Sequence, residues 1–287
     1  MAVDTFIPVW WSAKLLLALD TALVYGQHGV VSRDYEGEIR QAGDAVKINS
    51  VGDVTVKTYT RNTDMDAPEE LQTAEQMLLI DQAKYFNFQV DDVDIAQAKP
   101  GLPDEAMRRA SYSLRNVADS YIAGVMVAAL VAGNKIGTEA APKQDLGTAG
   151  KAYEYLVDLG VKLDQTDTPD AGRWVVVPSW FHGLLLKDSR FVASGTAEGD
   201  AVRRTGKVGE AAGFTILKSN QVPKTTATTK FKIIAGVDMA TSYAEQIVKV
   251  EAFRMEKRFA DGVKGLHVYG AKVVRPNQLA ALIADMP

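Results

Sequence analysis

A charged, threonine-rich arm at residues 51–77 constrains the fold of this chain more than any other segment. Threonine and charged side chains dominate positions 55–76, and large aliphatic side chains are nearly absent before Met77. A segment of this composition cannot bury enough apolar surface to build a core of its own. We therefore expect an extended arm that needs a neighbouring surface, with an ordinary mobile surface hairpin as the alternative.

Alternating strands are predicted on both sides of the arm. The first strand has lysine, asparagine and threonine at one parity, a possible bulge at Gly52, and apolar residues at the other parity. This apolar set is Val46, Ile48, Val54 and Val56. The return strand reaches through residues 81–94, and its in-phase apolar residues are Ile80, Phe86, Phe88 and Val90. A period of two is typical of half-buried strands.

A helix far longer than average is predicted at residues 103–133. Pro103, Asp104 and Glu105 suit the first turn of a helix, and Gly133 suits its end. Apolar residues recur every three or four positions, at Met107, Ala110, Leu114, Val117, Tyr121, Val125, Ala128 and Ala132. A helix of about 30 residues is a rod of about 45 Å. Gly124 inside it predicts close packing against another backbone, because glycine costs about 1 kcal/mol there relative to alanine.

The rest of the chain predicts an N-terminal helix, a separate α/β lobe and a closing hairpin. An amphipathic helix is expected at residues 10–25. The lobe contains a helix at 147–160, a buried strand at 173–177, a helix capped by Ser179, further strands, and a short helix at 242–247. The closing hairpin has long strands around a turn at 260–262, and we expect it to lie beneath the long helix.

The composition excludes several classes of function. The chain has 287 residues, a formal net charge of −4 and no cysteine, which excludes disulfides, thiolate metal sites and thiol catalysis. Lysine and arginine are scattered among aspartate and glutamate, so we expect no basic face and no tight binding to nucleic acid. The longest nearly apolar run, at 121–133, is shorter than the roughly 20 residues that a membrane span needs. We therefore expect no membrane association.

No constellation of residues predicts catalysis. His28, His182 and His267 lack metal-ligand spacing, so no metal is expected. Ser179 is better explained as a helix cap than as a nucleophile activated by His182. Alternation separates the carboxylates of residues 91–94, and the glycines of residues 206–213 do not match a phosphate loop. We predict no catalytic residue and no cofactor.

Five segments of the chain resemble the major capsid proteins of tailed bacteriophages in their order and spacing. They are VVSRDYEGEIRQAGDAVKI at 30–48, DQAKYFNFQVDDVD at 81–94, WVVVPSWFHGLLL at 174–186, VGEAAGFTILKSNQVP at 208–223 and VYGAKVVRPNQLAAL at 268–282. The resemblance covers nearly the whole chain. It implies the α+β fold of the Hong Kong 97-type capsid proteins, with an N-terminal arm, an extended E-loop hairpin, a peripheral domain with a long spine helix, and an axial domain.

The resemblance also implies a division of the chain and a set of contacts between subunits. The N-terminal arm is expected at 1–29, the first part of the peripheral domain at 30–50 and 78–146, the E-loop at 51–77, the axial domain at 147–245, and the closing hairpin and C-terminus of the peripheral domain at 246–287. Contacts with neighbouring subunits are expected at Trp10, Trp11, Lys57, Arg61, Asp64 and Asp66.

The function implied by the resemblance is structural. Such a protein self-assembles through pentamers and hexamers into an icosahedral or prolate head, which encloses double-stranded DNA without sequence-specific binding. Assembly in the host bacterial cytoplasm would involve a separate scaffolding protein, a portal protein and possibly a decoration protein. Two alternatives stay open: an encapsulin-like compartment shell that holds protein cargo, and a soluble enzyme with an unrecognised site.

Overall fold

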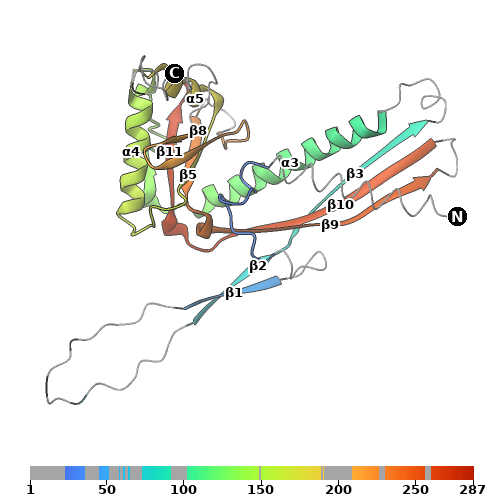
Figure 1. Ribbon diagram of the computed structural model, residues 1–287, viewed down its shortest axis with the longest axis horizontal. Helices are drawn as coiled ribbons and strands as arrows, with labels where there is room; N and C mark the ends of the chain where they lie inside the picture. The colour runs from blue at the N-terminus through green and yellow to red at the C-terminus, as the bar shows by residue number, and fades with distance from the viewer. Residues whose placement is uncertain are drawn as a thin grey trace.

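The computed structural model of the protein describes residues 23–35, 45–51, 58, 61, 64, 73–91, 102–148, 150–188, 190, 209–225, 230–255 and 260–287. Within these residues the chain forms sheets of two, three and six strands. Figure 1 shows an elongated molecule: a lobe lies at one end, a long layer of helix on sheet extends from it, and a hairpin projects from the layer.

The lobe is built in three layers around the six-stranded sheet. The strand order is β4 (Lys135–Ile136), β11 (Leu279–Asp285), β8 (Lys230–Gly236), β5 (Trp174–Val177), β7 (Phe214–Lys218) and β6 (Glu210–Ala211). Helices α4 (Lys151–Asp164) and α5 (Ser179–Lys187) cover one face. The C-terminal end of α3 (Leu102–Ala129) and the segment 23–31 cover the other. Strands β5 and β11 are therefore buried on both faces, which explains their unbroken apolar runs.

The long layer consists of α3 on a three-stranded antiparallel sheet. Its order is β3 (Gln82–Asp91), β10 (Ala260–Val273) and β9 (Thr241–Arg254). Odd-numbered residues of β10, such as Val263, Tyr269 and Ala271, pack toward α3. An even-numbered residue, Val268, packs under the hairpin of β1 (Ala45–Val51) and β2 (Thr73–Leu79). The helix and the hairpin thus lie on opposite faces of β10 (Figure 1).

Three connections join the lobe to the long layer, and each contains a short 3₁₀ turn. The turns are Ala132–Asn134 between α3 and β4, Asp238–Ala240 between β8 and β9, and Pro276–Gln278 between β10 and β11. A fourth short turn, Asp145–Gly147, precedes α4. The buried side chain of Asn134 donates to the carbonyls of Asn277 and Leu279, at 2.9 and 3.0 Å. Two of the connections are thereby held together.

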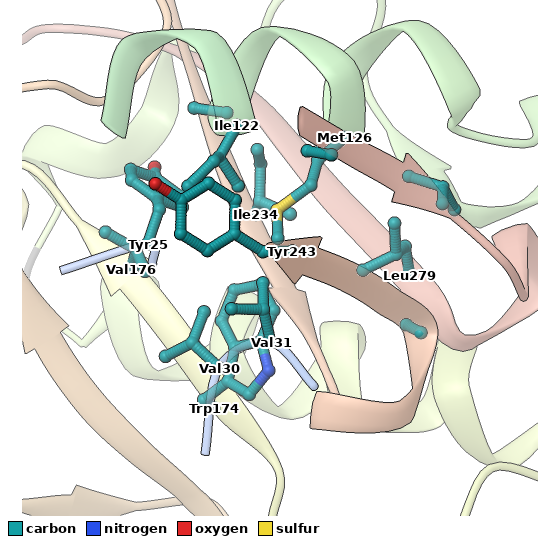
Figure 2. Packing of buried hydrophobic residues seen from close by; sticks show 14 of the residues in the cluster. Tyr25, Val30, Val31, Ile122, Met126, Trp174, Val176, Ile234, Tyr243 and Leu279 are labelled. Carbon is teal, nitrogen blue, oxygen red and sulfur yellow. The ribbon is translucent and has the colours of Figure 1, made fainter. Parts of the chain in front are cut away.

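One hydrophobic cluster spans both parts of the molecule. In Figure 2, side chains from α3, β5, β8, β9, β11 and the segment 23–31 converge. The labelled members are Tyr25, Val30, Val31, Ile122, Met126, Trp174, Val176, Ile234, Tyr243 and Leu279. Because the cluster draws on the lobe and the layer together, burial of apolar surface fixes one against the other.

The structure confirms the predicted long helix and closing hairpin, but the end of the helix and its buried residues differ from the prediction. Helix α3 ends at Ala129, and from Ala118 onward the buried positions lie one residue later than predicted. Val117, expected inside, is 44% exposed, whereas Ala118 is buried. The expected close approach at Gly124 is wrong, because a methyl group there would have nothing within 4 Å. The stripe shifts because segment 23–31 covers a second side of the helix.

Several local predictions in the strands are wrong. Strand β1 pairs with β2, not with the strand after Ile80, and β3 pairs instead with β10 in another sheet. Residues 242–247, expected as a helix, belong to β9. Residues 260–262 lie in β10, so the hairpin turns before them. A strand that alternates poorly over a few residues is easily misread when its partners are distant in sequence.

Helix ends also differ from expectation. Leu23 to Tyr25 are not helical; segment 23–27 forms bends, and the rest of the predicted 10–25 helix lies outside the described residues. Helix α4 starts and ends four residues later than predicted. The predicted cap at Ser179 is wrong: Pro178 occupies the N-cap position of α5 and no side chain caps it, while the Ser179 hydroxyl donates to Asn220 Oδ1 at 2.8 Å. The C-terminal strand β11 lies in the lobe sheet, whereas we expected residues 246–287 to end within the hairpin layer.

Two glycines predict opposite responses to added side chains. A Cβ on Gly270 would lie 2.2 Å from the Leu79 carbonyl, so Gly270→Val should push the hairpin off β10 and destabilise the fold by about 1–3 kcal/mol. The control Gly124→Ala, on the exposed side of α3, should stabilise it by up to about 1 kcal/mol. Urea unfolding followed by circular dichroism measures both. A neutral Gly270→Val would contradict the close packing of the hairpin.

Candidate functional site

The base of the hairpin presents an apolar face to solvent. Its inner residues Val46, Ile48, Leu78 and Ile80 pack against Ala244 and Val268 of the three-stranded sheet. The outer side chains of β2 alternate with these, so Met77 is 50% and Leu79 55% exposed. A two-stranded hairpin alone is marginally stable in water. The hairpin therefore depends on the body below it and offers a free apolar face above it.

A second feature is the segment 23–35, which is tied to the body by a buried carboxylate. Asp119 of α3 accepts the backbone N–H groups of Val24, Tyr25 and Gly26 at 3.0, 3.1 and 3.3 Å. Burial raises the pKa of Asp119, although these three donors and the nearby Arg115 oppose the rise. The carboxylate thus takes the place of the intrahelical partners that these N–H groups would have had in the predicted helix.

Farther along, the same segment enters a buried charge cluster. The Arg33 guanidinium pairs with Glu245 Oε1, and both side chains are nearly inaccessible to solvent. Glu245 Oε2 accepts the Tyr243 hydroxyl at 2.6 Å and lies 3.0 Å from His267 Nε2. The Arg33 guanidinium also lies over the ring of Tyr243, 5.7 Å from its centre. We call these four residues the charge cluster.

The position of the cluster follows from the register of β9 and β10. Tyr269 lies opposite Glu245, and the register shifts between Leu266 and His267, which indicates a β-bulge. Glu245 and His267 consequently share the face of the sheet that is turned toward α3. The charge of the Glu245 carboxylate would be costly at this buried position without partners. A backbone bridge between Ser32 and Ser242 brings Arg33 to them.

The ionisation of the cluster is set by competing effects. Burial acts to raise the pKa of Glu245, but the hydrogen bond with His267 and the charge of Arg33 outweigh it, so the pKa lies below its usual value. Burial and the adjacent Glu245 raise the pKa of Tyr243 well above its usual value. Tyr243 therefore stays a hydrogen-bond donor to an ionised carboxylate.

A polar groove of about 1030 Å³ lies where these parts meet. Segment 28–35, both strands of the hairpin, and residues around the turns Asp238–Ala240 and Pro276–Gln278 contribute to its walls. Arg33 and Asp34 line one side and Arg275 another. Since its walls come from separately connected parts of the chain, a movement of the hairpin against the lobe changes the shape of the groove.

The residues expected to carry contacts or chemistry are not gathered into one site. Arg61 and Asp64 are exposed, and the other contact candidates, Trp10, Trp11, Lys57 and Asp66, lie outside the described residues. Burial and then Lys218 lower the pKa of His182, but Ser179 bonds to an asparagine rather than to this histidine. Across the described ranges, no group of three or more histidine or carboxylate side chains could hold a metal ion.

The buried residues Arg33, Asp119 and Glu245 were missed by the sequence analysis. Misreading 242–247 as a helix hid the alternation that places Glu245 on the same strand face as Tyr243. A carboxylate inside the apolar stripe of a long helix, as at Asp119, was the one signal available.

In the part of the chain that the structure covers, no helix is long and apolar enough to cross a membrane.

Comparison with known proteins identifies the class of this fold. The family model described as phage capsid protein matches residues 75–282. A chain from Mycobacterium phage Che8 is 29% identical, with 88% of each chain covered and a TM-score of 0.66. The capsid of cyanophage P-SCSP1u is 17% identical, covers 87% of this chain and 85% of that one, and has a TM-score of 0.68. No curated protein matches the chain.

The fold is the Hong Kong 97-type fold of virus shells, and the chain belongs to the phage capsid protein family. Its role is structural, as a component of the multimeric shell of a virion. A virus-like particle from Pyrococcus furiosus shares the fold at 10% identity, with 96% of this chain and 99% of that chain covered and a TM-score of 0.57. The family match favours a phage capsid over an encapsulin-like compartment.

Removing the carboxylate of Asp119 tests the tie to segment 23–35. Asp119→Ala should destabilise the protein by about 2–4 kcal/mol, because three buried N–H groups lose a charged acceptor. The same change should expose segment 23–35 to limited proteolysis. The control Asp158→Ala, exposed on α4, should change stability by less than about 0.5 kcal/mol. Equal effects of the two substitutions would refute the tie.

The charge cluster should make the stability of the folded protein fall in acid. The folded-state pKa of Glu245 is lowered, so its stabilisation is present above the unfolded value of about 4.3 and is lost as the pH falls through the folded value. Glu245→Gln should remove this component and, at neutral pH, cost about 3 kcal/mol because Arg33 loses its anionic partner. Urea unfolding at several pH values checks both effects. Glu154→Gln, at an exposed ion pair, is the control.

Proposed function

We propose that this capsid protein assembles through pentamers and hexamers into an icosahedral or prolate head that encloses double-stranded DNA. The observation that carries the proposal is the hairpin of β1 and β2, which leaves the body with Met77 and Leu79 exposed on its outer face. A closed shell needs contacts that repeat from copy to copy, and a projecting apolar hairpin can reach a neighbouring copy.

The expected division of the chain supports this arrangement. In the proposal, segment 1–29 is the N-terminal arm, residues 51–77 are the E-loop, and 30–50 with 78–146 form the first part of the peripheral domain. The axial domain covers 147–245 and also takes in β11, which pairs with β8 of the same sheet. The remainder of 246–287 is the closing part of the peripheral domain, with β9 and β10 under α3.

Contacts between subunits are proposed on the arms. Arg61 and Asp64 are exposed and carry opposite charges, as suits polar contacts on a neighbour. Trp10, Trp11, Lys57 and Asp66 remain proposed contacts on the strength of the resemblance alone. Repeated modest contacts, each made by an arm on an adjacent copy, add up to a stable shell without one large interface.

The proposed partners and place of assembly follow from the family. We expect assembly in the host bacterial cytoplasm with a separate scaffolding protein and a portal protein, and we include a decoration protein as an optional partner. The proposal invokes no reaction and no cofactor. Enclosure of DNA is proposed without sequence-specific recognition.

The assembly role can be tested on the hairpin face. The double substitution Met77→Ser and Leu79→Ser should leave the subunit folded, since both side chains are exposed, but should prevent closed shells. Light-scattering mass and negative-stain microscopy of protein produced alone and with the neighbouring genes measure assembly. The matched control is Val131→Ser with Met286→Ser, two exposed apolar side chains of the lobe, and it should still assemble.

Each outcome of this experiment distinguishes the competing functions. Shells from the wild type but not from the hairpin variant support the proposal. A wild type that stays monomeric under both conditions contradicts it and favours an enzyme. Shells that contain protein cargo and no DNA, when produced with the neighbouring genes, would favour an encapsulin-like compartment.

A further inference from the structure

The face of the long layer that is turned away from α3 carries a pocket of about 350 Å³. The hairpin of β1 and β2 lies on the same face (Figure 1). The pocket lies next to the hairpin base, because one of its residues, Leu266, also packs against the cluster around Val268. All three strands of the sheet contribute to its lining, which consists of Tyr85, Asn87, Glu251, Lys264, Gly265 and Leu266.

The register of the sheet brings these side chains together. Tyr85 lies opposite Leu266. One rung farther along the sheet, Lys264 lies between Asn87 and Glu251. The intervening phenylalanines of β3 pack toward α3, so alternation turns the pocket residues to the other face.

The pocket has a charged end and an apolar end. At the charged end, the Lys264 ammonium pairs with Glu251 at 2.9 Å and lies 5.5 Å from the centre of the Phe253 ring. Both contacts draw Lys264 toward β9 and away from the next rung. The apolar end is formed there by Tyr85, which is 78% exposed, and by the half-buried Leu266. A large exposed ring beside a leucine is a surface suited to further apolar side chains.

The hairpin carries side chains that match the apolar end. Met77 and Leu79 are 50% and 55% exposed on its outer face. Methionine is unbranched and adapts to irregular apolar surfaces, and its sulfur makes favourable contacts with aromatic rings such as that of Tyr85. A pocket of this size has room for one or two such side chains.

The matching side chains must come from another copy of the chain. The inner side chains of the hairpin, such as Leu78, pack onto the sheet, so Met77 and Leu79 point away from the face that holds the pocket. A contact between two different surfaces is heterologous, and such contacts repeat from copy to copy and close into rings. Repetition of this kind is what a shell requires.

We propose that the pocket at Tyr85 and Leu266 receives the Met77 and Leu79 side chains of a second copy of this chain. The inference rests on the proposed assembly into a shell, and it names the surface that the projecting hairpin meets. Each copy then uses its hairpin on one neighbour and its pocket on another. The single contact is small, and its contribution to the shell comes from its repetition.

Cross-linking between copies tests the contact, and the chain has no cysteine that would give a background. Met77→Cys subunits and Tyr85→Cys subunits, one kind carrying a size tag, are produced in the same cells, purified as shells and treated with a short bismaleimide. We expect dimers on a denaturing gel that contain one subunit of each kind. The matched control replaces Tyr85→Cys with Val161→Cys, at an exposed side chain of α4, and should give no mixed dimers.

A further set of variants separates the contact from folding. Tyr85→Ser should leave the urea unfolding midpoint almost unchanged, because the ring is largely exposed. It should raise the subunit concentration needed for assembly about tenfold, as expected for the loss of an aromatic anchor. Met77→Ser should have a similar effect. The double variant should assemble no worse than either single variant, because both substitutions remove the same contact.

The possible failures can be told apart. If shells form without mixed dimers, another surface or another protein covers the pocket, and the inference is overturned while the shell function stands. Dimers between two Met77→Cys subunits would show that hairpins pair with hairpins, which also overturns it, as does assembly of Tyr85→Ser at the wild-type concentration. If the wild type forms no shells, the proposed function itself fails.

Discussion

The architecture depends on strand β10 packing against a different part of the protein on each face. At 14 residues it is long for a strand, so α3 and the hairpin can both pack on it. Tyr269 and its odd-numbered neighbours pack under α3, while Val268 and Gly270 meet the hairpin base. A slip of one residue would exchange these faces and leave both layers without a partner. The alternation of β10 therefore fixes the helix and the hairpin at the same time.

Glycines in β10 show how closely the neighbouring strands approach it. The Phe86 ring of β3 lies over Gly265, and the Phe253 ring of β9 lies over Gly262 on the opposite face. A methyl group at either glycine would come within about 2.5 Å of the ring. Aromatic rings over glycines recover apolar contact that the strand itself lacks. The two rings thus cover the strand at positions where it has no side chain of its own.

The sequence was sufficient to predict the elements whose periodicity is long and regular. Helix α3 and the closing hairpin needed only their own residues, because burial on one side leaves a repeating pattern. The partner of β1 could not be predicted in this way, because pairing is decided by contacts with a strand far along the chain. Gly124 shows the same limit: a glycine costs stability in a helix whether or not anything packs against it.

The candidate site was less accessible to prediction than the fold. Arg33 and Glu245 are 212 residues apart, so no local pattern shows that they pair. Their pairing follows from a backbone bridge between segment 23–35 and β9 that exists only in the folded chain.

Rigid and adaptable parts of the molecule are separated in a manner that suits a shell. The charge cluster and the shared core hold segment 23–35, the lobe and the long layer together, because breaking a buried ion pair leaves an uncompensated charge. Among the described residues, the hairpin contacts the body at its base, next to a groove whose walls come from both lobe and layer. In the proposed shell, we expect copies in differently curved positions to differ in the angle of the hairpin, while the shared core stays closed.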